Sequence, residues 1–236
     1  MIWLSDEIIL KTENLGKIYA PGTPMEVHAL RGVNLEIRRG EMVAIMGPSG
    51  CGKTTLLNLI GGIDKPTYGK IIIKGKDIST LTDEEMTEFR LFNIGYIFQL
   101  FNLFDFLTAL ENTVLPLLLT KTSRFEAEEE AKMMLRQMGL GDKLNHLPSE
   151  LSGGEQQRVA VSRALLMNPA IILGDEPTGD LDEMTSKDIM DLFRSINENF
   201  KQTFIVVTHS KYIAEFCDRT IRIIDGQIVD DGYGGK

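Results

Sequence analysis

One segment limits the possible folds more than any other part of this sequence. Residues 47–54 read GPSGCGKT, which fits the pattern Gly-x-x-x-x-Gly-Lys-Ser/Thr. The apolar run Met42–Met46 precedes it, and the helix-forming run Thr55–Ile60 follows it. A buried strand, a glycine-rich turn and a helix in this order are typical of the phosphate-binding loop (P-loop) of α/β proteins. The alternative, a glycine-rich turn that ends in Gly-Lys-Thr by chance, is disfavoured by the strand and helix on either side.

The residue types of this loop suit a bound triphosphate. Glycines allow successive backbone N–H groups to face phosphate oxygens, and the start of the following helix adds a favourable partial charge. Lys53 would neutralise the terminal phosphates, and the Thr54 hydroxyl would ligate Mg²⁺. The residues predicted to bind the nucleotide here are Gly47, Ser49, Gly50, Cys51, Gly52, Lys53, Thr54 and Thr55.

Nearly continuous apolar runs predict a parallel sheet, because strands buried on both faces have this pattern. The predicted strands are Met42–Met46, Ile94–Phe98, Ile171–Leu173 and Thr203–Val207. Apolar residues recur with the helical period over Thr185–Phe200, which predicts an amphipathic helix that returns the chain to the sheet.

Two further regions differ from this core. Short runs bounded by turn residues predict a small antiparallel sheet from Ile8–Lys11, Val33–Ile37 and Gly69–Lys74. Between Leu100 and Leu151 the sequence predicts a helical insertion, with a capping box at Thr108 and Glu111. An apolar stripe in the insertion comprises Ala131, Met134, Leu135 and Met138. The dipeptide Asp225-Gly226 predicts a tight hairpin turn near the end of the chain.

Composition limits the possible partners. A chain with 43% hydrophobic and 25% charged residues is expected to fold, and its formal net charge of −9 argues against a nucleic-acid partner. Its two cysteines, Cys51 and Cys217, lie far apart without metal-ligand spacing, which favours a reducing cytoplasm. Polar residues interrupt the most apolar region, residues 94–119, so we expect no membrane-spanning helix.

Two adjacent carboxylates follow the predicted strand at Ile171–Leu173. In a parallel sheet this end of a strand faces the ligand crevice. Asp175 would hold Mg²⁺ directly or through water, and Glu176 could accept a proton from the water that attacks the γ-phosphate. An acidic pair after a strand is more often the solvated start of a loop, but the P-loop makes the catalytic interpretation the stronger one.

A second anion-binding turn precedes a helical stretch near Gln156. Residues 151–155 read LSGGE, which places Ser152, Gly153 and Gly154 where a helix N-terminus offers free N–H groups. A single γ-phosphate would not need two such turns. With both motifs in this order, the whole chain resembles the nucleotide-binding subunits of ABC transporters, in which the LSGG motif of one subunit closes over the ATP held by the P-loop of its partner.

This resemblance implies roles for four more residues. Tyr19 matches the aromatic residue that stacks on adenine, and Gln99 matches the glutamine that senses the γ-phosphate and contacts the metal. Asp182 matches the loop that contacts the second subunit, and His209 matches the switch histidine. The implied catalytic set is Glu176, His209, Gln99 and Lys53, and the implied metal set is Thr54, Gln99 and Asp175.

The resemblance also implies the fold and the domain organisation. We expect a single α/β domain with the RecA-like core of P-loop NTPases, an N-terminal antiparallel β subdomain and an inserted α-helical subdomain. The core would comprise residues 1–99 and 159–236, and the helical subdomain residues 100–158. The expected ligands are ATP and Mg²⁺.

Motifs after Gln99 are similar to those of the ABC branch that includes the lipoprotein-release, macrolide-export and cell-division ATPases. This likeness implies a second ATPase subunit, an integral membrane permease, and a cytoplasmic protein held at the inner face of the membrane. An ATPase that gates a non-transport membrane partner, or a soluble ABC ATPase, are the alternatives. The apolar residues that follow Gln99 could be core or a docking groove for the permease, and they are Phe101, Leu103, Phe104, Phe106 and Leu107.

Asp180 departs from the family pattern, in which Ala or Asn is more common at this position. The substitution removes no phosphate ligand, but it adds a negative charge to the loop expected to contact the second subunit.

Overall fold

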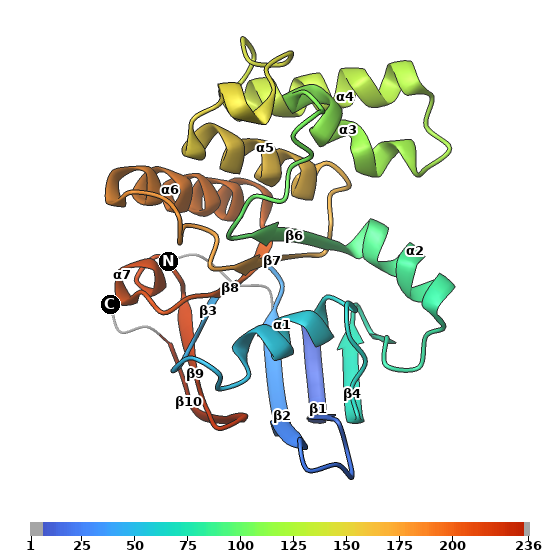
Figure 1. Cartoon of the computed structure of the whole chain (residues 1–236), viewed down its shortest axis with the longest axis vertical. Helices are drawn as coiled ribbons and strands as arrows, with labels where there is room; N and C mark the ends of the chain where they lie inside the picture. The colour runs from blue at the N-terminus through green and yellow to red at the C-terminus, as the bar shows by residue number, and fades with distance from the viewer. Residues whose placement is uncertain (1–6, 234–236) are drawn as a thin grey trace.

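Two sheets lie side by side in the computed structural model, which describes residues 7–233 (Figure 1). The antiparallel sheet has the order β2-β1-β4-β5 and is formed by β1 (Ile8–Tyr19), β2 (Val27–Arg38), β4 (Tyr68–Ile73) and β5 (Lys76–Asp77). It contains all three strands predicted for this part of the chain, although β1 and β2 are much longer than their apolar runs. The predicted antiparallel β subdomain is therefore confirmed.

The second sheet is the predicted parallel core. Its order is β10-β9-β3-β8-β7-β6, and only the hairpin partner β10 runs antiparallel to its neighbour. Its strands are β3 (Met42–Met46), β6 (Ile94–Phe98), β7 (Ile171–Asp175), β8 (Thr203–Val207), β9 (Arg219–Ile224) and β10 (Gln227–Tyr233). The turn between β9 and β10 has positive φ at both Asp225 and Gly226, as the tight hairpin prediction requires.

The parallel sheet is buried on both faces because its strands carry apolar side chains at consecutive positions. Val43 and Ile45 of β3 pack with helix α1 (Lys53–Ile60) and the antiparallel sheet, whereas Met42 and Ala44 pack with helix α6 (Glu183–Phe200). Successive side chains of a strand point to opposite faces, so this one short strand packs against the elements on both faces of the sheet.

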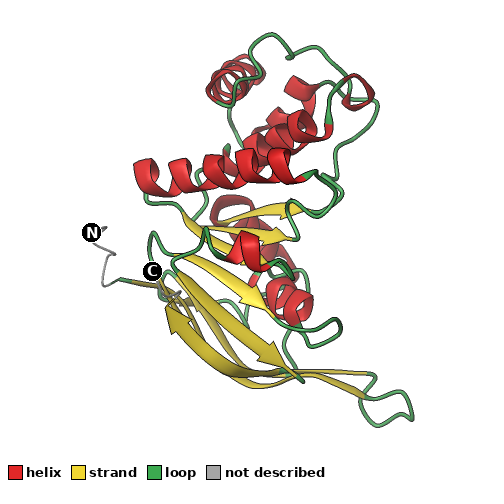
Figure 2. Cartoon of the chain, turned by 90° about the vertical axis from the view of Figure 1, so that its left-hand side faces the viewer, coloured by secondary structure: helices red, strands yellow, loops and turns green. Residues whose placement is uncertain are grey.

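The helical subdomain lies above the core in Figure 1 and is inserted between β6 and β7. It contains α3 (Ala109–Leu118), α4 (Arg124–Gln137), the short 3₁₀ helix Pro148–Glu150 and α5 (Gly153–Leu165). Thr108 and Glu111 form the predicted capping box at the start of α3. Figure 2 shows that helices gather at this end of the molecule and strands at the other.

The insertion has two small apolar clusters of its own, and α5 links it to the core. Val159 of α5 packs among residues of the insertion, whereas Val161 and Leu165 pack against the face of the parallel sheet that α6 covers. The division of the chain at residues 99/100 and 158/159 stays a prediction.

Several boundaries differ from those expected. Helix α5 begins at Gly153 rather than near Gln156, and α6 begins at Glu183 rather than Thr185. Helix α2 (Asp83–Asn93) was not predicted, although Thr82 and Glu85 form a capping box at its start. A short helix, α7 (Lys211–Ala214), precedes β9. Within residues 7–233, no helix has the length and apolarity needed to cross a bilayer.

Candidate active site

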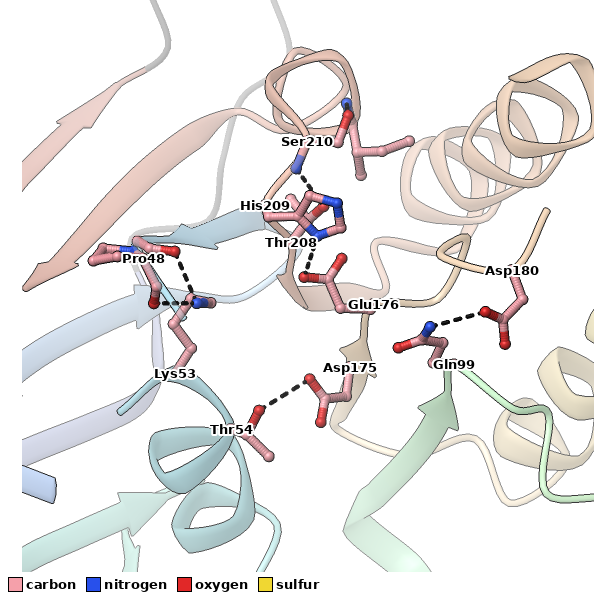
Figure 3. A network of polar contacts seen from close by, with 12 residues as sticks. Pro48, Lys53, Thr54, Gln99, Asp175, Glu176, Asp180, Thr208, His209 and Ser210 are labelled. Atoms are coloured by element: carbon pink, nitrogen blue, oxygen red, sulfur yellow. Dashed lines mark hydrogen bonds and ion pairs between the residues drawn. The ribbon is translucent and has the colours of Figure 1, made fainter. Parts of the chain in front are cut away.

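The register of the parallel strands brings the predicted catalytic residues to one edge of the sheet. Phe98 of β6 lies opposite Asp175 of β7, which lies opposite Val207 of β8. The residues that follow these positions therefore leave the sheet side by side, and Figure 3 shows Gln99, Glu176 and His209 around the same space as Lys53.

The P-loop wraps the start of α1 and leaves its first N–H groups available. Gly52 is the N-cap residue, with φ +105°, and no side chain caps the helix. A Cβ at this position would lie 2.4 Å from the carbonyl oxygen of Ala29, so only glycine fits. An uncapped helix start with no acidic residue in its first turn suits an anion.

Lys53 lies across this loop. Its Nζ donates hydrogen bonds to the carbonyl oxygens of Gly47 at 2.8 Å and Pro48 at 2.9 Å (Figure 3). Cys51 differs from its neighbours, because its side chain is buried and its backbone N–H donates to the Pro48 carbonyl at 3.4 Å. The loop thus presents Lys53 to an anion, while Cys51 contributes mainly to packing beneath it.

Thr54 and Asp175 form a pair of oxygen donors suited to Mg²⁺. The Thr54 hydroxyl donates to Asp175 Oδ1 at 3.4 Å, a long contact that joins the first turn of α1 to the end of β7. Burial raises the pKa of Asp175, and the neighbouring charge of Glu176 raises it further, whereas Thr54 and Lys53 oppose the shift. A cation would hold this carboxylate in its ionised form.

Thr54 and Asp175 suit Mg²⁺, which shares its coordination with water and phosphate, better than they suit a metal ion held entirely by protein side chains. Among the described residues no group of three or more His, Cys, Asp or Glu side chains could hold a metal ion. Mg²⁺ commonly uses one or two protein oxygens together with water and phosphate oxygens, which is the donor set that Thr54, Asp175 and a nucleotide would supply.

Glu176 has a strained backbone and a well-defined orientation. Its φ is +48°, which is unusual for a residue other than glycine, and its N–H donates to the carbonyl oxygen of Val207 at 3.0 Å. Its Oε1 lies 2.8 Å from Nδ1 of His209 (Figure 3). Strain of this kind is found at functional sites where the surrounding structure maintains it. Glu176 and His209, two members of the implied catalytic set, are therefore in contact.

Gln99 contacts Asp180, the residue that departs from the family pattern. Its side-chain Nε2 donates a hydrogen bond of 2.9 Å to Oδ1 of Asp180, and its side chain lies against Gly179. The sequence did not predict this pairing, because the whole helical subdomain and β7 lie between the two residues in the chain.

The LSGG turn lies apart from the P-loop cavity. Ser152 caps α5 in a reciprocal pair with Glu155, and the adjacent Gly153 packs against Leu181. The cavity beside the P-loop has a volume of about 720 Å³ and is lined by Lys53, Asp175 and Glu176 among others, but not by Ser152, Gly153 or Gly154. The P-loop and the LSGG turn of one chain therefore lie at separate places on the molecule.

Asp182 lies near the LSGG turn and caps α6. Its two carboxylate oxygens accept hydrogen bonds from the backbone N–H of Thr185 at 2.9 Å and from the Thr185 hydroxyl at 2.7 Å. A Cβ at Gly154 would lie 2.6 Å from the methyl group of Thr185, so the two helix starts are in close contact. Asp182 thus belongs to the surface that carries Ser152.

The orientation of Tyr19 is fixed by two neighbours. Its hydroxyl donates to Asp64 Oδ2 at 2.9 Å, and Lys17 Nζ lies 2.6 Å from Asp64 Oδ1 and 4.9 Å from the centre of the Tyr19 ring. Tyr19 is 39% exposed, so it offers a surface for stacking. Lys17 and Asp64 were not predicted, since a single sequence gives no signal that links them to Tyr19.

Comparisons with known proteins identify the relatives of this chain. The sequence model described as "ABC transporter" matches residues 30–179. A lipoprotein-releasing system ATP-binding protein, LolD 1 of Rhodopseudomonas palustris, is 44% identical over 93% of this chain and 98% of its own length. The macrolide export ATP-binding/permease protein MacB of Rhodopirellula baltica is 46% identical over 87% of this chain, which spans 30% of that longer protein.

A solved structure extends the likeness to three dimensions. The ATP-binding cassette MJ0796 of Methanocaldococcus jannaschii, in a dimeric post-hydrolysis state bound to ADP and Pi, has a TM-score of 0.86 and 44% identity, covering 96% of this chain and 100% of the cassette. The chain described here belongs to the ABC transporter ATP-binding family. It is an ABC-type ATPase whose relatives include the lipoprotein-release and macrolide-export proteins, as the sequence predicted.

Proposed function

We propose that two copies of this chain close around two ATP molecules, with the P-loop of one chain facing the LSGG turn of the other. The observation that carries this proposal is the separation of the P-loop from the LSGG turn within one chain, since Ser152 does not line the cavity that holds Lys53. The dimeric state of MJ0796, bound to ADP and Pi, supports the same arrangement. A twofold axis would make both sites equivalent.

In the proposed reaction each side chain around the cavity has a separate role in binding ATP or in activating the attacking water. Lys53 would exchange its bonds to the Gly47 and Pro48 carbonyls for phosphate oxygens, at little cost because both partners are acceptors. Glu176 would take a proton from the attacking water, and His209 would orient that carboxylate through Nδ1. Mg²⁺, held by Thr54, Asp175 and Gln99, would neutralise charge on the phosphate oxygens. Tyr19 would stack on the adenine.

The proposed exchange between subunits can be tested by mixing two inactive variants. Lys53→Ala removes the P-loop cation, and Ser152→Arg blocks the LSGG turn. If the turns act across the interface, a mixed dimer contains one intact site, and the mixture should hydrolyse ATP faster than either variant alone. If Ser152 served the ATP of its own chain, every chain in the mixture would be defective and no activity would return.

We also propose that the chain binds a membrane permease through a groove of about 1360 Å³ between α2, β6 and the helical subdomain, which would place it at the cytoplasmic face of the membrane. Two large apolar side chains of this groove are exposed, Phe92 by 46% and Leu119 by 76%. An exposed apolar groove of this size is typical of a binding site.

This groove is not formed by the apolar segment after Gln99, which the sequence offered as a docking groove. Of the apolar residues after Gln99, Leu103 packs in the core of the insertion, whereas Phe104 and Phe106 are exposed and in contact with each other. None of these residues lines the groove, although the adjacent Asn102 does. The segment borders the proposed docking site instead of forming it.

Substitution of the groove tests the proposal directly. Phe92→Asp and Leu119→Asp should prevent copurification with the tagged permease while the isolated subunit keeps its ATPase activity. Phe125→Asp is a matched control, because Phe125 is 74% exposed on α4 and does not line the groove. Equal loss in all three variants would point to a general effect of charge.

The names of the relatives favour export or lipoprotein release over a non-transport partner.

A further inference from the structure

The hydrogen bond between Gln99 and Asp180 joins a proposed metal ligand to a residue without a role in the proposed reaction. The bond is 2.9 Å long, with the Gln99 Nε2 as donor and Asp180 Oδ1 as acceptor. Both residues are exposed, and they come from different loops, one after β6 and one after β7. Figure 3 shows the pair at the rim of the site, on the side away from Lys53.

The two ends of the Gln99 amide have opposite chemistry. The NH₂ group only donates and the carbonyl oxygen only accepts, whereas an ionised carboxylate has no proton to donate. Asp180 therefore selects the orientation in which the NH₂ group faces it. Figure 3 shows the amide oxygen of Gln99 on the opposite side, toward Asp175 and Glu176.

Only this orientation is useful to a hard cation, because Mg²⁺ binds amides through oxygen. We propose that Asp180 is a positioning residue that turns the amide oxygen of Gln99 toward the Mg²⁺ site. The inference rests on the proposed function of Gln99 as a metal ligand and adds the residue that orients it. Groups that orient metal ligands in this way commonly contribute 10- to 100-fold to metal affinity.

The loop that carries Asp180 is held firmly enough for this role. Gly179 N–H donates to the carbonyl of Glu176 at 2.9 Å, and Leu181 N–H donates to that of Thr178 at 3.2 Å, so the segment consists of consecutive turns. Asp182 then fixes the loop to α6 as its N-cap. The position of the Asp180 carboxylate is thus tied to β7 and α6.

Gly179 provides the space in which the Gln99 side chain lies. A Cβ at this position would be 3.1 Å from both Cδ and Nε2 of Gln99, closer than most packed carbon atoms approach. The contact and the hydrogen bond act on the same amide from two adjacent residues. Together they define one place and one orientation for it.

The first test measures the affinity for a fluorescent ATP analogue, once with Mg²⁺ and once with EDTA. The Mg²⁺ ratio is the affinity with Mg²⁺ divided by the affinity in EDTA. Asp180→Ala and Gln99→Ala should each lower this ratio by roughly 10-fold or more. Binding in EDTA should stay unchanged, because Lys53 and the P-loop provide it. The double variant should lose no more than Gln99→Ala alone, since Asp180 acts only through Gln99.

The second test exchanges the donor and the acceptor. Gln99→Glu places two carboxylates face to face and should lower the Mg²⁺ ratio. Adding Asp180→Asn restores one donor and one acceptor with their places exchanged, and it leaves a free carboxylate oxygen for the metal. The ratio should recover in the double variant. Asp142→Ala removes one exposed negative charge elsewhere and serves as the control for net charge.

The outcomes distinguish this inference from the function on which it rests. A normal ratio in Asp180→Ala together with a lowered ratio in Gln99→Ala would overturn the positioning role and leave Gln99 as a ligand. A normal ratio in Gln99→Ala would overturn both. Failure of Asp180→Asn to improve Gln99→Glu would also contradict the inference, because the exchanged pair keeps the same hydrogen bond.

Discussion

Lys53 illustrates how a single side chain can be essential for function but nearly neutral for folding. Its Nζ donates to the carbonyl oxygens of Gly47 and Pro48 and lies near the Cys51 sulfur, all within its own loop. Lys53→Ala should therefore abolish measurable ATP binding, while the melting temperature changes little. Fluorescent-nucleotide binding and thermal unfolding of the same sample would check both parts. Near-normal ATPase activity in this variant would contradict the P-loop assignment.

The two cysteines should differ in their response to pH and to nucleotide. Burial raises the pKa of Cys217 to about 12, so its thiol should resist alkylation in the native protein even at pH 9. Cys51 lies beneath the P-loop with its Sγ 3.9 Å from Lys53 Nζ, and bound Mg-ATP should slow its labelling. Mass spectrometry of alkylated peptides measures each thiol separately. Rapid native labelling of Cys217, or labelling of Cys51 that ignores nucleotide, would contradict this.

Among elements, the contact between α6 and β8 offers the clearest test of core packing. Phe193 is fully buried and its ring stacks on that of Phe204 at 5.0 Å between centroids. Phe193→Ala should cost about 3–5 kcal/mol of stability, because it removes buried contacts and leaves a cavity. Phe200→Ala is the matched control on the same helix, since Phe200 is 74% exposed and should change stability by no more than about 0.5 kcal/mol. Denaturant unfolding would measure both.

The elements that the sequence predicted well are those with a strong periodic or apolar signal. The runs at Met42–Met46 and Thr203–Val207 match β3 and β8 residue for residue. Helix α2 was missed because its charged surface leaves only Met86 and Phe89 buried, which is too weak a stripe to see in one sequence. The start of α5 was misplaced because Gly153 and Gly154 are poor helix formers. The start of α6 was misplaced because its first turn precedes the apolar period, although Asp182 and Glu183 are typical of a helix N-terminus.

At the scale of the whole molecule, the sequence predicted which residues gather at the site but not how they pair. Asp175 ends β7, and Glu176 and His209 follow the parallel strands β7 and β8, so the sheet alone brings them together. The pairing of Gln99 with Asp180 depends on how a loop folds after β7, and that of Tyr19 with Asp64 depends on a turn after α1. Such contacts arise from tertiary packing, for which a single sequence carries no signal.

In the proposed cycle, ATP closes two copies of this chain, and Glu176 starts the hydrolysis that reopens them. Glu176→Gln keeps the size of the side chain but removes the base, so hydrolysis should fall by roughly 10²- to 10⁴-fold while ATP binding survives. The variant should then elute as a long-lived dimer with Mg-ATP in size-exclusion chromatography, as a monomer with Mg-ADP, and as a monomer with Mg-ATP when Ser152→Arg is added. A Glu176→Gln protein that stays monomeric at saturating ATP, or that hydrolyses ATP at the wild-type rate, would contradict the account.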